Sequence, residues 1–324
     1  MSRHKVFVTR PLPPVAEPLI KRLRQTCEVE IWPSMDDPAP TAEKIRSLDG
    51  LATYGHEPIT DAMMASAPNL KVISNIGVGH DHIDSEAARR RGVAVGNTPG
   101  VLSGATADMT FALLLAGGRL LGPSSRYVRA RQWRSYDPNL FWGCEVHHST
   151  IGIVGMGRIG YEVAKRARGF DMKILYYKRN RREDWERELG MRYAPLNELL
   201  EASDFVTLHA PMSPETKEMI GAAELKRMKR TAVLVNAARG GIVDHAALHE
   251  ALTSGEIAAA ALDVTEPEPL PFDSPLIDLD NCFIAPHLGS ATVETRLKMI
   301  EMALENLMAG LNGKPLPYSF LERT

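Results

Sequence analysis

Three glycines with the spacing Gly155-x-Gly157-x-x-Gly160 follow a short apolar run, and a segment with helical periodicity follows them. The apolar run, residues 151–154, is typical of a buried strand. Between a strand and a helix, the first glycine of this spacing allows a tight turn, the second lets a pyrophosphate approach the backbone, and the third lets the helix pack closely on the strand. The alternative is an ordinary glycine-rich turn. We favour a dinucleotide site, with contacts from Gly155, Gly157, Arg158, Ile159 and Gly160.

The rest of the chain alternates short apolar runs with helix-length segments, which predicts βαβ units and parallel sheets. In the first hundred residues we expect strands at 5–9, 29–32, 50–53, 71–74 and 93–95, and helices near 14–25, 41–48, 60–67 and 83–91. From residue 150 onward, six apolar runs predict a complete dinucleotide-binding sheet. A long helical stretch is expected over about 103–130, a structured loop over 131–143 and a last helix over about 290–311. The length of 324 residues suits two domains.

The second strand of the predicted dinucleotide-binding sheet ends in the cations Lys178, Arg179, Arg181 and Arg182. In NAD-binding sheets, an acidic residue about 20 positions beyond the glycines usually holds the ribose 2′-hydroxyl, and no carboxylate occupies that place here. Lysine and arginine would instead bind a 2′-phosphate through charge-assisted hydrogen bonds. We therefore expect NADPH to be preferred, with NADH possible. Lys178 and Arg179 lie nearest the strand end, and Arg181 follows. The alternative is a solvated helix start, in which the acids at 183–188 pair with the arginines.

The composition excludes several classes of function. A formal net charge of −2 gives no overall basic field for binding nucleic acid or membrane. The longest apolar stretch, FALLLAGG at 111–118, is too short to span a bilayer, and the N-terminal segment lacks the apolar core of a signal peptide. Cys27, Cys144 and Cys282 are far apart and form no CxxC pair, which favours a reducing compartment. We expect a cytoplasmic protein that acts on a small molecule.

Polar side chains follow the later strands of the predicted sheet, at the edge where open α/β folds bind ligands. Reduction of a 2-oxo acid requires an anchored carboxylate, a polarised carbonyl and a proton for the developing alkoxide, while the cofactor supplies the hydride. Arg239 can anchor and polarise through a bidentate fork. His287 can donate the proton, and Glu268 can orient its ring and favour its charged form. The alternatives are a surface arginine and a structural histidine.

The sequence resembles the D-isomer-specific 2-hydroxyacid dehydrogenase family over almost its whole length, most strongly in GIVGMGRIG, VNAARGGIVD, LDVTEPEPLP and APHLGSAT. The resemblance implies that Arg239 binds and polarises the substrate, that Glu268 pairs with the histidine, and that His287 is the acid/base. Glu266 lies two residues short of the matching place and is secondary. The implied α/β fold has two domains. A Rossmann-type doubly wound parallel sheet, residues 101–288, is inserted into a flavodoxin-like substrate domain, residues 1–100 and 289–324, and the active site lies in the cleft.

The resemblance also implies substrate contacts in the first segment. The family's glycine-rich turn, here within NIGVGHDHID, faces the substrate, so Val78 and Gly79 would bind its carboxylate as backbone donors. His80 and His82 look like a metal pair, but no third ligand is evident, and we expect no metal. Further cofactor contacts are expected from Pro211, Ala237, Asp263 and Gly289.

Within the family, the sequence is most similar to glyoxylate/hydroxypyruvate reductases. In that subgroup, an apolar side chain of the loop near 135–142 reaches the active site of the neighbouring subunit in a dimer, which makes Leu140 and Trp142 candidates here. We expect a homodimeric NADPH-dependent reductase that converts glyoxylate or hydroxypyruvate into a D-2-hydroxy acid. The alternatives are a 2-ketogluconate reductase, a more distant member acting on formate or 3-phosphoglycerate, and a non-catalytic NAD(P)-sensing regulator.

Overall fold

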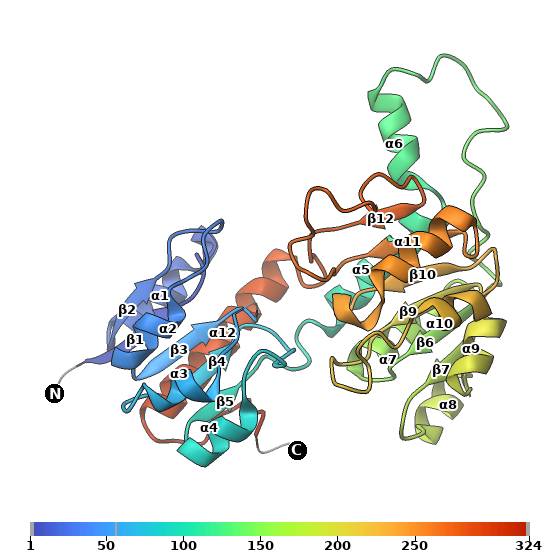
Figure 1. The fold of residues 1–324 in the computed structure, drawn as a ribbon. Helices are drawn as coiled ribbons and strands as arrows, with labels where there is room; N and C mark the ends of the chain where they lie inside the picture. Colours follow the sequence, from blue (N-terminus) through green and yellow to red (C-terminus); the bar gives the residue numbers. More distant parts are fainter. Residues whose placement is uncertain (1–2, 56, 322–324) are drawn as a thin grey trace. The chain divides into compact units, whose positions relative to one another are not determined.

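The computed structural model describes residues 3–55 and 57–321 of the chain. The chain divides into two compact units. Unit 1 contains residues 1–102 and 291–324, and unit 2 contains residues 103–290. Each unit is built around its own parallel sheet (Figure 1).

The sheet of unit 1 has five parallel strands in the order β2-β1-β3-β4-β5. The strands are β1 (His4–Val8), β2 (Cys27–Ile31), β3 (Gly50–Thr53), β4 (Val72–Asn75) and β5 (Ala94–Gly96). This is the flavodoxin-like order of a doubly wound sheet. The β3 and β4 strands are buried along their whole length, as expected when helices cover both faces of a sheet. All five strands predicted in this part of the chain are confirmed, each within two residues at either end.

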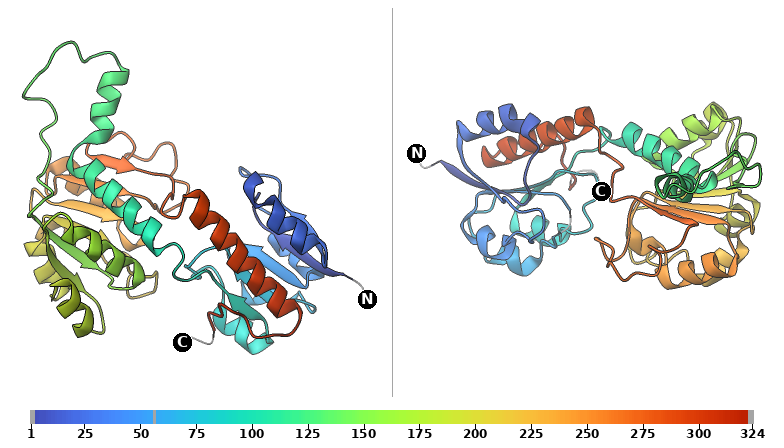
Figure 2. Two further views of the ribbon diagram at one scale, coloured as in Figure 1. Left: turned by 180° about the vertical axis from the view of Figure 1, so that it is seen from behind. Right: turned by 90° about the horizontal axis from the view of Figure 1, so that it is seen from above.

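Helices cover both faces of this sheet. One face packs against the short helices α2 (Thr41–Lys44), η2 (Ile45–Ser47), α3 (Asp61–Ala65) and α4 (Ser85–Arg91). The other face carries η1 (Pro14–Ala16), α1 (Glu17–Arg24) and α12 (Val293–Leu311), the last of which returns from the end of the chain (Figure 2). A Cβ atom on Gly310 would lie 2.6 Å from Val72 Cβ, so α12 approaches β4 more closely than any larger residue allows.

The sheet of unit 2 has seven parallel strands in the order β12-β11-β10-β9-β6-β7-β8. The strands are β6 (Thr150–Val154), β7 (Lys173–Tyr177), β8 (Arg192–Tyr193), β9 (Phe205–Leu208), β10 (Val233–Asn236), β11 (Ala259–Leu262) and β12 (Cys282–Ile284). The strand order reverses at β6, next to β9, and this is the switch point where Rossmann sheets bind dinucleotides. The six predicted strands are confirmed. The seventh, β8, has two residues at the sheet edge and was not predicted.

The helices of unit 2 form two layers. The first apolar layer includes side chains of α5 (Ser103–Gly118), α7 (Arg158–Arg168) and α8 (Glu183–Leu189). The opposite layer includes side chains of α9 (Leu196–Ala202), α10 (Ala222–Arg227), η3 (Gly240–Ile242) and α11 (His245–Ser254). The unit is therefore doubly wound, as predicted.

The helical stretch predicted over 103–130 is confirmed, but the structure divides it into two helices. The first, α5, ends at Gly118, Leu120 adopts a left-handed conformation with φ 52°, and α6 (Leu121–Arg129) starts in a new direction. A continuous helix would need an N–H at Pro123, which proline lacks, whereas the first turn of a new helix does not need it. The carbonyl of Gly118 instead accepts a hydrogen bond from the Cys144 N–H at 2.7 Å.

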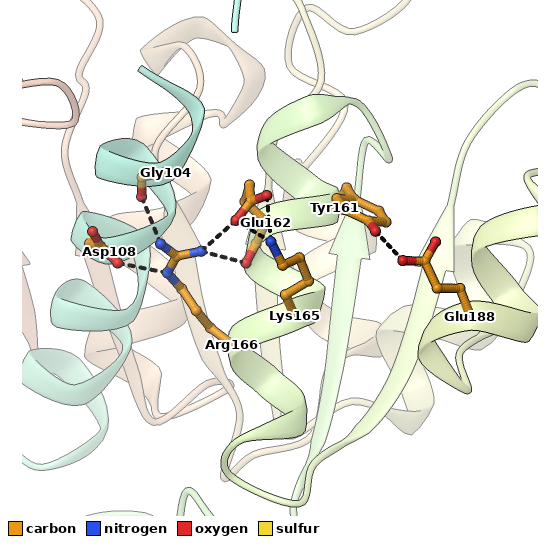
Figure 3. A network of polar contacts seen from close by, with 7 residues as sticks. All are labelled: Gly104, Asp108, Tyr161, Glu162, Lys165, Arg166 and Glu188. Atoms are coloured by element: carbon orange, nitrogen blue, oxygen red, sulfur yellow. Dashed lines mark hydrogen bonds and ion pairs between the residues drawn. The ribbon is translucent and has the colours of Figure 1, made fainter. Parts of the chain in front are cut away.

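The two helices α5 and α7 are joined by one arginine (Figure 3). Arg166 on α7 donates through Nε to Asp108 at 2.7 Å and through Nη2 to the Gly104 carbonyl at 3.2 Å, both on α5. Its Nη1 also donates to the Glu162 carbonyl and carboxylate, at 2.8 and 3.0 Å. The glycine turn leads directly into α7. This network therefore helps to fix the helix whose N-terminus belongs to the candidate cofactor site.

Candidate active site

The glycine turn lies between β6 and α7, as the sequence predicted. Gly155 has φ 100°, and a Cβ there would lie 2.5 Å from the backbone at His209 and Ala210. A Cβ on Gly160 would lie 2.4 Å from the Gly155 carbonyl oxygen, so this glycine allows close packing of helix on strand. Gly157 precedes α7, and no described atom lies within 4 Å of a Cβ built on it. The turn therefore leaves open space at a helix N-terminus, which fits a pyrophosphate.

The cations after β7 fall into two classes. Arg181 donates to both carboxylate oxygens of Glu186, at 2.7 Å each, and Arg182 donates to both oxygens of Asp184, at 3.1 and 2.9 Å. These pairs belong to the start of α8, as the alternative interpretation expected. In the described part of the chain, no ion pair engages Lys178 or Arg179. Burial and the Arg182 charge lower the pKa of Lys178, so a nearby anion would favour its charged form.

Arg239 follows β10, which is separated from β6, the strand before the glycine turn, by β9 alone. Its Nη1 donates to the Ala238 carbonyl at 2.9 Å, and the Asn236 side chain donates to the Arg239 carbonyl at 2.8 Å. A Cβ on Gly240 would lie 2.0 Å from the Thr265 backbone, so only glycine lets this loop touch the loop after β11. The contact brings the arginine loop against the segment that carries Glu268.

His287 and Glu268 are in direct contact. The His287 Nδ1 and Glu268 Oε1 atoms are 2.5 Å apart, and both side chains are partly exposed. The contact through Nδ1 orients the imidazole ring relative to the Glu268 carboxylate. Glu266, two residues before Glu268, lines a cavity of about 540 Å³ together with residues that include Lys217, Asp244 and His245.

Asp263 organises the turn that presents His287. Its two carboxylate oxygens accept hydrogen bonds from the N–H groups of Leu288 and Gly289, at 2.7 Å each, and its carbonyl accepts from the His287 N–H at 2.9 Å. His287 has φ 55°, a conformation that costs a non-glycine residue free energy and needs such support. Burial raises the pKa of the Asp263 carboxyl, although the two N–H donors act in the opposite direction.

The predicted substrate turn, Val78-Gly79, follows β4 in unit 1. The Val78 carbonyl accepts from the Asn97 side chain at 2.9 Å, and the Gly79 carbonyl accepts from the Asn75 side chain at 2.5 Å. Within residues 3–55 and 57–321, no hydrogen bond involves the N–H of Val78 or of Gly79. The turn thus offers two N–H donors to a ligand. The supporting residues Asn75 and Asn97 were not predicted, although each stands at or directly after a strand end.

The remaining predicted site residues lie in loops of unit 2. Pro211 follows β9, and its carbonyl accepts from the Thr216 hydroxyl at 2.7 Å. Ala237 directly follows β10 and is buried. Leu140 and Trp142 lie in the loop after α6, which extends away from the sheet (Figure 1). Trp142 is 77% exposed, and its indole donates to the Pro138 carbonyl at 2.7 Å.

In the part of the chain that the structure describes, neither a metal-binding cluster nor a membrane-spanning helix is found. No three histidine, cysteine, aspartate or glutamate side chains gather there in a way that could hold a metal ion. No described helix is long and apolar enough to cross a membrane.

Comparison with known proteins gives a consistent result. Residues 111–289 match the family model described as D-isomer specific 2-hydroxyacid dehydrogenase, NAD binding domain. A glyoxylate reductase of Korarchaeum cryptofilum is 47% identical over 97% of this chain and 94% of its own length. A glyoxylate reductase of Pyrococcus furiosus is 46% identical with the same coverage of both chains.

Solved structures of similar proteins share the whole fold. A Thermus thermophilus protein superposes with a TM-score of 0.90 at 44% identity, and the match covers 98% of this chain and 99% of that one. An NADPH-dependent glyoxylate/hydroxypyruvate reductase of Sinorhizobium meliloti, solved with NADP and malonate, has a TM-score of 0.86 at 32% identity. That match covers 98% of this chain and 97% of the other.

Proposed function

Because this chain belongs to the D-isomer-specific 2-hydroxyacid dehydrogenase family, it is an oxidoreductase, and we propose that it reduces small 2-oxo acids to D-2-hydroxy acids with NADPH. Glyoxylate and hydroxypyruvate are the proposed substrates. The observation that carries the proposal is the contact between His287 and Glu268, on a turn held by Asp263 beside the strand ends of a dinucleotide-binding sheet. A histidine with one nitrogen fixed by a carboxylate is suited to proton transfer through the other.

The cofactor site fits a nicotinamide dinucleotide, which supplies a hydride when bound. We propose that the N–H groups at the start of α7 bind its pyrophosphate in the open space at Gly157. Lys178 and Arg179 would bind the 2′-phosphate of NADPH, since Arg181 is already engaged by Glu186. A bound phosphate would offset the desolvation of Lys178.

The protein residues then perform three tasks. Val78 and Gly79 would hold the substrate carboxylate with their N–H groups. Arg239 would bind the same carboxylate and polarise the carbonyl, because a guanidinium presents donors in a planar fork. As the carbonyl carbon gains a hydride, its oxygen gains negative charge, and His287 Nε2 would transfer a proton to that oxygen. Glu268 would stabilise the imidazolium before the transfer and hold the ring in place.

A rate matrix tests this proposal. NADPH and NADH are each assayed with glyoxylate, hydroxypyruvate, 2-ketogluconate and pyruvate. We expect rapid oxidation of NADPH with the first two acids and much slower oxidation of NADH. A preference for 2-ketogluconate would keep the three catalytic roles and change the substrate. NADPH binding without turnover of any acid would instead favour a cofactor-sensing regulator.

The variant His287→Ala tests the proton-transfer role. We expect reduction to be lost while NADPH still binds, because the side chain acts on the substrate and the glycine turn is untouched. His147→Ala is the matched control, since that side chain is exposed and lies outside the site, and it should retain wild-type turnover. Retained turnover in His287→Ala would exclude this histidine as the proton donor.

We also propose that the protein is a homodimer formed through an arm made of α6 and residues 130–143. The arm bears exposed apolar side chains, namely Leu121, Val128, Trp133, Tyr136 and Trp142. Several large apolar side chains exposed on one segment are typical of a protein interface. Leu140 and Trp142 would then reach the partner's substrate. Light scattering should give about twice the chain mass of 35.7 kDa, and a value equal to one chain would exclude the dimer.

A further inference from the structure

Unit 1 carries a tyrosine and an arginine near the substrate turn that the proposed mechanism does not use. Tyr54 follows β3, and Arg296 lies in the first turn of α12. Both side chains are partly buried. In the part of the chain that the structure describes, the Tyr54 hydroxyl makes no hydrogen bond. A partly buried hydroxyl without a partner leaves a donor and an acceptor unsatisfied, which a ligand can satisfy.

Tyr54 lies at the same sheet edge as Val78 and Gly79. The strands β3 and β4 pair in parallel with Thr53 opposite Asn75, and the Ile76 N–H donates to the Thr53 carbonyl at 2.7 Å. Tyr54 therefore leaves the sheet beside the segment that becomes the substrate turn. A Cβ on Gly55 would lie 3.8 Å from the Asn75 side chain, which holds the Gly79 carbonyl.

The packing of α12 brings Arg296 to this edge. Leu307 lies 3.3 Å from the Cβ position of Gly50, at the start of β3, and α12 runs back from there along the strand (Figure 2). From Leu307 back to Arg296 the helix rises by about 16 Å, and from Gly50 to Tyr54 the strand rises by about 13 Å. The two residues thus reach the same end of the sheet.

Electrostatics supports this placement. Burial raises the pKa of the Tyr54 hydroxyl to about 12, and the Arg296 charge acts on it in the opposite direction. The phenol therefore stays protonated at neutral pH and can donate a hydrogen bond.

We infer that Tyr54 and Arg296 are specificity-determining residues that select 2-oxo acids with an oxygen atom on C3. If the carboxylate is held by Val78 and Gly79, the substituent beyond the carbonyl lies at the same edge, within reach of neighbouring side chains. A C3 hydroxyl can accept from the guanidinium and exchange a hydrogen bond with the phenol. A site that hydrogen-bonds a hydroxyl discriminates strongly against an analogue that lacks it. The inference rests on the proposed function and adds the choice of substrate within it.

The test compares hydroxypyruvate with pyruvate, which differs only by the C3 hydroxyl. The ratio of their kcat/KM values with NADPH is measured for wild type, Tyr54→Phe and Arg296→Lys. We expect Tyr54→Phe to lower the ratio about tenfold, the effect of one hydrogen bond to a substrate hydroxyl. Arg296→Lys keeps the charge but loses the planar fork, and it should lower the ratio by a similar factor.

A matched control is Tyr318→Phe, because Tyr318 is also a partly buried tyrosine of unit 1, and its charge acts on Lys298. In Tyr318→Phe the ratio of kcat/KM for hydroxypyruvate over pyruvate should stay within about twofold of wild type. If Tyr54→Phe and Arg296→Lys both keep the wild-type ratio and melting temperature, the inference is overturned. Wild-type turnover of glyoxylate, which has no C3, separates this result from failure of the proposed function, since the absence of any 2-oxo acid turnover would remove both.

Discussion

The structure separates the cations after β7 into Lys178 and Arg179, which have no ion pair among the described residues, and Arg181 and Arg182, which are held by carboxylates. A charge-assisted hydrogen bond contributes roughly 1.5–3 kcal/mol, and two of them, even at the lower value, favour NADPH by about a hundredfold. We expect the double variant Lys178→Ala/Arg179→Ala to lower the ratio of kcat/KM for NADPH over NADH by about that factor.

The control for this prediction is Arg187→Ala, an exposed cation farther along the same segment. It should change the cofactor ratio by less than about twofold. An unchanged ratio in the double variant would assign the preference to other residues. A loss of NADPH and NADH activity in equal measure would point to damage of the turn rather than to recognition of the phosphate.

His209 lies directly after β9, and neither of its buried ring nitrogens has a hydrogen-bond partner in the described structure. Burial lowers its pKa to about 3, below the usual 6.5. Below pH 6.5 the unfolded chain binds a proton at this residue that the folded chain does not bind. The neutral histidine therefore contributes stability above pH 6.5 that is lost progressively as the pH falls toward 3.

We expect the free energy of unfolding to fall by about 1.4 kcal/mol for each pH unit below 6.5 because of this residue. Urea unfolding at pH 7.5 and pH 5.0 measures the loss in wild type and in His209→Asn, which should lose about 2 kcal/mol less than wild type. The exposed-site control His147→Asn should keep the wild-type loss. Equal losses in His209→Asn and wild type would contradict the assignment.

At the residue scale, the sequence indicated candidate side chains for the site but not how the loops that carry them pack together. Glu266 and Glu268 are two positions apart, and the residues alone did not separate them. The resemblance pointed to Glu268, and the structure places it against His287. The separation depends on Gly240, which packs on the Thr265 backbone. A contact between two loops 25 residues apart is invisible to a local pattern.

At the scale of elements, Arg166 joins α5 to α7 (Figure 3). Replacement by methionine keeps much of the aliphatic stem but leaves Asp108, Glu162 and the Gly104 carbonyl without their shared donor. We expect Arg166→Met to lower the free energy of unfolding by about 2 kcal/mol. Urea unfolding measures this change, with NADPH binding retained in the folded protein.

Lys165→Met is the control for Arg166→Met, because Lys165 pairs with Glu162 of its own helix at 2.9 Å and lies over the Tyr161 ring of the same helix, 5.8 Å from its centroid. Such a pair contributes about 0.3–0.5 kcal/mol on a helix. If both variants lose the same small amount, the Arg166 network is not a link between the two helices.

The elements that sequence patterns missed have weak local signals. The strand β8 is only Arg192–Tyr193 and lies at the sheet edge, so it depends on pairing with β7 rather than on its own pattern. The break at Leu120 also escaped prediction, because apolar residues continue through it and the deciding hydrogen bond comes from Cys144. Central strands, in contrast, are buried on both faces and appear in the sequence as continuous apolar runs.

At the scale of the whole molecule, both apolar layers of unit 2 are formed only by residues 107–285. Unit 1 differs, because α12 covers its sheet from the far end of the chain. We therefore expect the fragment 103–290 to fold alone and bind NADPH without reducing any 2-oxo acid, since the proposed substrate turn at Val78 and Gly79 is absent.

The fragment 1–102 provides the contrasting case, because loss of α12 exposes the side chains of β3, β4 and β5 that this helix covers. We expect it to show no cooperative thermal transition by circular dichroism, whereas 103–290 should melt cooperatively and at a higher temperature when NADPH is present. A cooperative transition in 1–102 would mean that the first five strands and their short helices form a domain without α12. Unfolded 103–290 would mean that the dinucleotide-binding unit depends on the segments that flank it.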